Sequence, residues 1–109
     1  MGERAAAARR KAARPPLSVA LKWTRKAHAD LVRLYEFLEP VNAAAAARTV
    51  RLLVAGAARV PAHPRLGVRM PEFAGREVRR VFVGEYEMRY ELAGTDVLIL
   101  RIFHTREDR

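Results

Sequence analysis

Cysteine is absent from the sequence, and this absence excludes several kinds of chemistry. The chain cannot form a disulfide, bind a metal through thiolates or use a cysteine nucleophile. Histidine is scarce as well, because only His28, His63 and His104 occur and they are scattered along the chain. Histidines this far apart in the sequence make a weak case for a metal site. We therefore expect neither a metal nor a cofactor.

Long apolar runs are also missing. None approaches the roughly 18 residues that a membrane-spanning helix needs. The basic residues near the start are followed by Pro15 and Pro16 and then by an alternating segment, whereas a secretory signal would continue with an apolar core. We expect a cytoplasmic protein without membrane association. A chain of 109 residues suits one domain with one core.

Complete catalytic motifs are lacking too. The sequence has no glycine-rich phosphate loop, no histidine pair at metal spacing and no nucleophile elbow. An RNA-cleaving site needs proton-transfer groups and cations that stabilise the phosphorane. No lysine follows Lys26, so few residues are available to catalyse RNA cleavage. That set consists of Arg79, Arg89 and Arg101 as cations and of His104, Glu77, Glu87 and Glu91 as proton-transfer groups.

The positive charge is abundant and unevenly distributed. The net charge is +9: residues 1–17 carry +4, residues 18–75 carry +5, and residues 76–109 carry equal numbers of basic and acidic residues. A basic surface favours anionic partners such as nucleic acid or an acidic protein segment. Residues 1–16 contain no large apolar residue, and we expect a flexible basic arm. Such an arm can contact nucleic acid.

Residues 76–106 predict three short strands joined by two tight turns. Residues 86–92 alternate between apolar and polar side chains, as a strand with one buried face does. Gly84 and residues 93–96, which flank this strand, are of types common in tight turns. Residues 97–103 are apolar on both faces, which suits an inner strand.

The upstream residues predict a first strand and a helical cover for this sheet. Residues 17–23 alternate like a strand, and Thr24 follows as a plausible N-cap of an amphipathic helix that ends before Pro40. A second helix is expected over about residues 42–60, and the short connection favours an antiparallel pair. Residues 61–71 contain three prolines and a glycine and predict an irregular loop.

The predicted order is β-α-α-β-β-β, an α+β domain over residues 17–109. A helical hairpin would pack on one face of a small, mainly antiparallel sheet, and the first strand can lie beside the last. We expect Tyr86, Met88, Tyr90, Leu92, Leu98, Leu100 and Ile102 to face the helices. The opposite, open face would then carry Glu87, Arg89, Glu91, Val97, Ile99, Arg101 and Phe103.

The open face is where we expect function. Arg89 and Arg101 should share it, and either Arg79 or Arg80 should join them from the preceding strand. The alternative is a solvated face with arginine–glutamate pairs across strands, each worth less than about 1 kcal/mol.

Five short motifs follow one another between about Val19 and Asp108. They are Trp-Thr-x-x-Ala-x-x-Asp-Leu at 23–31, Tyr-x-x-Leu at 35–38, His-Pro-Arg-Leu-Gly at 63–67, Val-Arg-x-Val-x-Val-Gly-x-Tyr-x-x-x-Tyr at 78–90, and Ile-Leu-Arg-Ile-x-His-x-Arg-x-Asp at 99–108. Each is degenerate alone, but their order and spacing make the match fairly specific. Together they resemble the ParE/RelE superfamily of type II toxins, and its ParE-like branch most closely.

This resemblance implies a toxin that is neutralised by a cognate antitoxin protein, whose C-terminal segment wraps the toxin. Members resembling ParE act on DNA gyrase, whereas members resembling RelE are ribosome-dependent mRNA endonucleases. The chain lacks the lysine-rich catalytic strands of the second group and keeps the His-x-Arg-x-Asp ending of the first. Gyrase inhibition is therefore favoured, with mRNA cleavage as the alternative, and DNA would be contacted only through the antitoxin complex.

The resemblance also frames the expected site residues. We expect Arg79, Arg89, Arg101 and Arg106 to lie close to the surface that contacts the antitoxin or the target. If the protein is an endonuclease, the catalytic set would be Arg79, Arg89, Arg101 and His104. A third hypothesis is a nucleic-acid-binding adaptor that uses residues 1–16. An amphipathic antitoxin segment can lie along the helical hairpin and add a strand at a sheet edge, and an acidic one complements the positive charge of residues 18–75.

Overall fold

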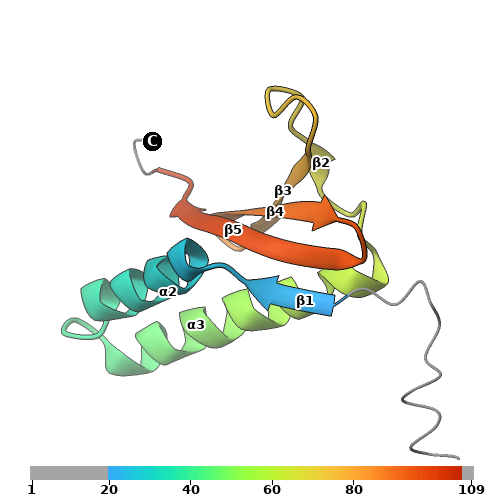
Figure 1. Cartoon of the computed structure of the whole chain (residues 1–109). Coiled ribbons are helices and arrows are strands. Elements are labelled where there is room, and N and C mark those ends of the chain that lie inside the picture. The colour runs from blue at the N-terminus through green and yellow to red at the C-terminus, as the bar shows by residue number, and fades with distance from the viewer. Residues whose placement is uncertain (1–19, 107–109) are drawn as a thin grey trace, which may run out of the picture.

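The computed structural model describes residues 20–106, within which two α-helices lie on one face of a five-stranded sheet (Figure 1). The elements are β1 (Ala20–Trp23), α2 (Arg25–Leu38), α3 (Ala43–Ala58), the 3-10 helix η1 (Val60–Ala62), β2 (Val68–Arg69), β3 (Glu77–Val83), β4 (Tyr86–Ala93) and β5 (Asp96–His104). This arrangement confirms the predicted fold class. The basic arm at residues 1–16 and the start of the first predicted strand lie outside the described residues.

The sheet order is β1-β5-β4-β3-β2, so the first strand lies beside the last, as the sequence suggested. β1 runs parallel to β5, whereas the other neighbours are antiparallel. Two-residue turns join β3 to β4 and β4 to β5, and each begins with a glycine at positive φ, 59° for Gly84 and 61° for Gly94. A glycine at the first central position is what a type II′ hairpin turn requires.

Both helices begin at side-chain caps. Thr24 Oγ1 accepts a hydrogen bond from the Ala27 amide at 3.1 Å, which confirms the predicted N-cap, and it donates to the Ile99 carbonyl of β5 at 2.8 Å. Asn42 caps α3 through the Ala45 amide at 2.9 Å. The Thr24 hydroxyl therefore caps α2 and ties the junction between β1 and α2 to β5, the strand beside β1.

The core lies between the helices and the sheet. Its fully buried members include Ala27, Leu53 and Ala57 from the helices and Met88 and Tyr90 from β4. Tyr86 and Leu92 of β4 pack against this core together with Met88 and Tyr90, which confirms the predicted inward face of that strand. Leu21 and Trp23 of β1 pack against the same core.

The prediction of a wholly irregular loop over residues 61–71 was wrong, because η1 begins just before this stretch and β2 lies inside it. The segment is held against the sheet by Tyr90, whose hydroxyl donates to the Pro64 carbonyl at 2.7 Å and accepts from the Gly67 amide at 2.8 Å. Gly67 fits because a Cβ there would lie 2.6 Å from the Arg80 carbonyl oxygen. This long-range anchoring is not visible in local sequence.

The predicted facing of β5 was partly wrong. The register shifts at one point, because Arg89 is opposite Arg101 while Tyr90 is opposite Ile99, and Leu100 is left without a partner on β4. Such a bulge shifts the alternation of side chains by one residue between the two halves of the strand, so the residues before Leu100 face the opposite way from the prediction. Val97 and Ile99 are therefore buried in the core, whereas Leu98 and Leu100 are only partly buried. Ile102, beyond the bulge, is buried as predicted.

Candidate functional site

Three arginines form a row across the open face of the sheet. Arg80 of β3 is opposite Arg89 of β4, and Arg89 is opposite Arg101 of β5. Residues opposite each other on neighbouring strands share a face, so the three side chains leave the sheet on the same side. The prediction that Arg89 and Arg101 share this face is confirmed. The third member is Arg80 and not Arg79.

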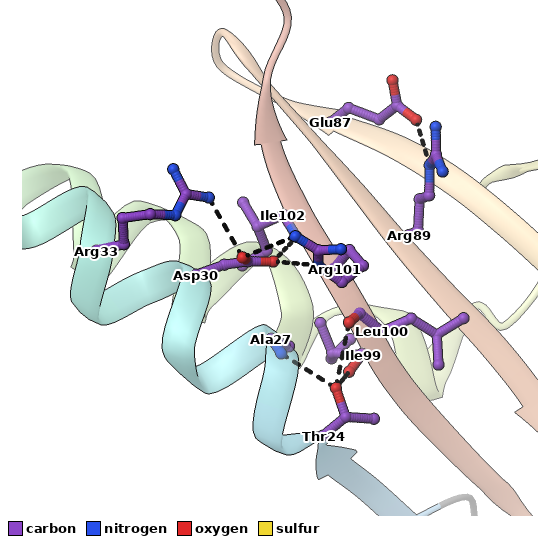
Figure 2. A network of polar contacts seen from close by, with 10 residues as sticks. All are labelled: Thr24, Ala27, Asp30, Arg33, Glu87, Arg89, Ile99, Leu100, Arg101 and Ile102. Atoms are coloured by element: carbon purple, nitrogen blue, oxygen red, sulfur yellow. Dashed lines mark hydrogen bonds and ion pairs between the residues drawn. The ribbon is translucent and has the colours of Figure 1, made fainter. Parts of the chain in front are cut away.

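Directly opposed like charges destabilise a sheet unless each has a counterion. Arg89 Nε lies 2.8 Å from Glu87 Oε2, and Arg101 binds Asp30 through Nε and Nη2 at 2.9 and 3.2 Å (Figure 2). Both guanidinium carbons also lie over the ring of Phe103, at 4.9 and 4.8 Å from its centroid. The two arginines are therefore held by carboxylates and by a shared aromatic ring.

Glu87 and Phe103 occupy the open face as predicted, yet neither is solvated. Glu87 is 0% exposed and Phe103 is 8% exposed. The predicted alternative of exposed arginine–glutamate pairs is therefore wrong for Glu87, whose carboxylate is buried beside Arg89. Alternation assigns a residue to a face, but it does not tell whether that face is covered.

Asp30 is the buried centre of a second network, which sequence reasoning missed. Its carboxylate accepts the Ile102 amide of β5 at 2.8 Å and also contacts Arg101 and Arg33 (Figure 2). Burial would raise the pKa of Asp30, but hydrogen bonds from Arg101, from the Ile102 amide and from Arg33 outweigh it, and the pKa lies below 3.8. A signal existed, because Asp30 interrupts the apolar stripe of α2 three residues after Ala27.

Arg79 lies on the helix-covered side of the sheet. It is opposite the buried Tyr90, donates from Nη1 to the Gly67 carbonyl at 2.7 Å and pairs with Glu77 at 2.9 Å. Glu77 also pairs with Arg65 at 3.1 Å, and the Arg79 guanidinium lowers the pKa of the Glu77 carboxyl below 4.5. Arg79 therefore fastens the segment before β2 to β3. It does not join Arg89 and Arg101.

His104 also lies on the helix side, opposite Tyr86. Its ring meets Tyr86 edge to face at 5.1 Å, and Nε2 lies 3.2 Å from Glu85 Oε1. The Arg106 amide donates to His104 Nδ1 at 3.1 Å, and the Arg106 residue is exposed. The structure therefore does not assemble the predicted endonuclease set, since Arg79 and His104 lie on one face and Arg89 and Arg101 on the other.

An open groove lies where the end of α2 and the start of α3 meet the β3–β4 turn and the end of β5. Its volume is about 690 Å³. Phe37 and Leu52 on its walls are 79% and 51% exposed. Polar groups are few, namely Arg33, Thr49, Glu85 and His104. The apolar lining also includes Leu34, Leu38, Tyr86 and Ile102. Sequence reasoning placed a partner on the helical hairpin but did not locate this groove.

Other kinds of site find little support in the described part of the chain. Residues 20–106 hold no group of three or more histidine or acidic side chains arranged to bind a metal. None of the helices there is both long and apolar enough to cross a membrane.

Comparison with known proteins identifies the family. The family model described as "ParE toxin of type II toxin-antitoxin system, parDE" matches residues 21–109. A solved structure of the chromosomal ParDE system from P. aeruginosa is similar with a TM-score of 0.70 and 27% identity, over 81% of this chain and 97% of that one. The RelBE2 toxin–antitoxin complex from Mycobacterium tuberculosis is similar with a TM-score of 0.59 and 25% identity, over 83% and 94%. The comparison with curated protein sequences gave no match. The chain therefore belongs to the ParE toxin family of type II toxin–antitoxin systems.

Proposed function

We propose that this ParE-family toxin inhibits DNA gyrase in the cytoplasm by binding it, and that a cognate antitoxin neutralises the toxin by covering the groove. The alternative is ribosome-dependent mRNA cleavage. The two differ in chemistry, because inhibition by binding needs a contact surface only. Cleavage needs cations and proton-transfer groups around a single phosphate.

The observation that carries the gyrase proposal is the separation of the candidate catalytic groups. On the open face, Arg89 is engaged by the carboxylate of Glu87, and Arg101 is engaged by the carboxylate of Asp30 from α2. His104 sits on the opposite face and contacts Glu85 and Tyr86. A phosphate held by the arginines would therefore be out of reach of the imidazole. Membership in the ParE family supports the same choice.

The antitoxin proposal rests on the groove. Exposed apolar surface of this kind typically marks an interaction site. Phe37 and Leu52 present large side chains that an amphipathic helix can cover. Arg33, which contacts Asp30, also lines the groove and adds positive charge there for an acidic side chain. The two similar solved structures are both toxin–antitoxin structures.

The deciding experiment measures supercoiling by purified gyrase with and without the purified toxin. We expect inhibition by the wild-type chain, and we expect it to be relieved by the antitoxin from the neighbouring gene. A His104→Gln variant should inhibit gyrase as the wild type does. Cleaved mRNA with unchanged supercoiling would contradict the proposal and support the endonuclease, in which case His104→Gln should lose activity.

The basic arm provides a separate control. Deleting residues 1–16 should leave gyrase inhibition intact if the domain begins at residue 17. A deletion that abolishes activity would instead favour a nucleic-acid-binding role for the arm.

A further inference from the structure

A second apolar surface lies on the open face of the sheet, at its β2–β3 end. Val68 and Phe82 are 64% and 56% exposed there. Val68 is opposite Arg80 in the register, and the Arg80 guanidinium lies 5.7 Å from the centroid of the Phe82 ring. We call Val68, Arg80 and Phe82 the outer patch. It faces away from the helices, whereas the groove opens between the helices and the other face of the sheet.

Arg80 differs from its neighbours in its charge environment. Arg79, Arg89 and Arg101 each pair with a carboxylate within 2.9 Å. Arg80 has no carboxylate partner among the described residues and contacts the Phe82 ring instead. A guanidinium held over an aromatic face keeps its donor groups available and can take a carboxylate through two parallel hydrogen bonds. The outer patch therefore presents a positioned cation between two exposed apolar side chains.

The backbone beside the patch is also available. In residues 20–106, β2 covers only Arg79 and Arg80 of β3, so the outer edge at Phe82 has no strand partner. Val83 and Tyr86 flank the two-residue turn and form the last pair of the β3–β4 ladder. Peptide groups alternate along a strand, so those of Phe82 point to the outer edge. An extended segment can pair with the main chain there.

The charge around the patch restricts what fits. Residues 65–82 contain five arginines and two glutamates, so this part of the chain is positive. Glu87, which is opposite Phe82, is buried and leaves no exposed carboxylate at that position. An acidic partner segment is therefore favoured, and a basic one is repelled.

We propose that the outer patch is the surface through which the toxin holds its protein target. The occupant is an extended acidic segment of that target, with a carboxylate on Arg80 and an apolar side chain between Val68 and Phe82. This inference rests on the proposed function, in which the target is gyrase. Gly84 and Glu85, which follow Phe82 within three residues, line the groove. An antitoxin bound in the groove thus lies next to the patch and can exclude the target by its bulk.

The test compares Arg80→Glu and Phe82→Ala with Arg69→Glu. Arg69 is exposed, lies on the neighbouring strand β2 and is opposite Arg79. Arg69→Glu therefore makes the same charge change on the helix-covered face of the sheet. Gyrase tetramer is the probe, with inhibition of supercoiling, binding affinity and growth arrest as readouts. We expect the two patch variants to inhibit about tenfold more weakly or worse, because arginine and aromatic anchors dominate such contacts. Arg69→Glu should stay within about twofold of wild type.

Two further results would overturn the assignment of the outer patch to the target. Antitoxin affinity should change by less than about twofold in every variant, and an equal loss of antitoxin and gyrase binding in Arg80→Glu would overturn the assignment to the target. Patch variants that inhibit like Arg69→Glu would also overturn it. Should Arg80→Glu fail to fold by circular dichroism, Arg80→Gln replaces it in the same comparison.

The proposed function can fail separately. A wild-type chain that arrests growth without inhibiting gyrase refutes the gyrase target. The outer patch is then tested by growth arrest alone: a loss in Arg80→Glu but not in Arg69→Glu supports it, and equal growth arrest by the two variants overturns it. A wild-type chain with neither effect overturns both proposals.

Discussion

Asp30 of α2 and Arg101 of β5 face each other across the boundary between the helical layer and the sheet. Two hydrogen bonds of 2.9 and 3.2 Å join the guanidinium to the carboxylate, and the Ile102 amide donates to the same carboxylate at 2.8 Å. β1 pairs with β5 only from Asp96 to Ile99. Asp30 therefore provides, at Ile102, the acceptor that a continuing neighbouring strand would have offered.

Replacing Asp30 by alanine should lower the free energy of unfolding by about 3 kcal/mol. The substitution leaves the Ile102 amide and the Arg101 guanidinium without their acceptor in a partly buried position, where loss of one partner is costly. Urea unfolding followed by circular dichroism measures the change. Asp30→Asn is the matched control, because its amide oxygen can still accept the Ile102 amide, and it should lose less. An alanine variant within about 0.5 kcal/mol of wild type would contradict this role.

Acid should weaken the fold partly through the same carboxyl. Because the pKa of Asp30 is lower in the folded chain than its ordinary value of 3.8, the folded state favours the charged form. The stabilisation is fully present above that ordinary value and is lost as the pH falls through the folded pKa. Glu77 and Glu91, whose pKa values lie below 4.5 because of Arg79 and Arg76, add losses of the same sign.

Unfolding free energy measured from about pH 6 to about pH 3 tests this linkage. The wild-type chain should lose stability with a steeper acid slope than Asp30→Asn, whose side chain does not titrate. Equal slopes for the two proteins would show that Asp30 does not have a lowered pKa in the folded state.

The sequence predicted local elements well because their causes are local. Thr24 caps α2 with its own hydroxyl, and the glycines at the hairpin turns meet a requirement of those turns alone. The facing of β5 was different, because nothing in the run from Val97 to Phe103 marks Leu100 as the bulged residue. Residues 97–100 are all apolar, so either alternation of inward and outward side chains fits them.

The candidate site was harder to predict because it depends on register. Arg79 and Arg80 are adjacent in sequence, and only the pairing of β3 with β4 shows which of them joins Arg89. The partners of the buried Asp30 carboxylate, Arg101 and Ile102, are distant in sequence. The burial of Glu87 on the open face cannot be read from the alternation of its strand. His104 was assigned to the arginines by its place at the end of the last strand, but it lies two residues after Ile102 and therefore on the same, helix-covered side of the sheet.

Gly56 is expected to be required for packing between α3 and β3. A Cβ at this position would lie 2.8 Å from Val83 Cγ2, and the β-branched Val83 side chain has little freedom to move away. Alanine normally stabilises a helix interior by about 1 kcal/mol relative to glycine, but overpacking costs about 1–3 kcal/mol. Gly56→Ala should therefore destabilise the chain in thermal or urea unfolding.

A double variant separates the two effects. In Gly56→Ala combined with Val83→Ala, the new methyl group meets the space left by the valine, so the Gly56→Ala step should become neutral or stabilising. If Gly56→Ala costs the same in both backgrounds, the contact with Val83 is not its cause.

The groove should govern antitoxin binding without governing the fold. Leu52 lines the groove and is 51% exposed, so a charged side chain can replace it while remaining in solvent. Leu52→Glu should weaken binding of the cognate antitoxin by about 30-fold, the effect of losing a contact worth about 2 kcal/mol, because the carboxylate would be buried against an apolar partner. Val54→Glu is the matched control, since Val54 lies on the same helix at 44% exposure and is not part of the groove lining. Isothermal titration calorimetry gives both affinities, and unfolding curves check that the two variants are equally stable. If Leu52→Glu and Val54→Glu bind the antitoxin equally, the groove is not its site, because the two differ mainly in which surface of α3 they change.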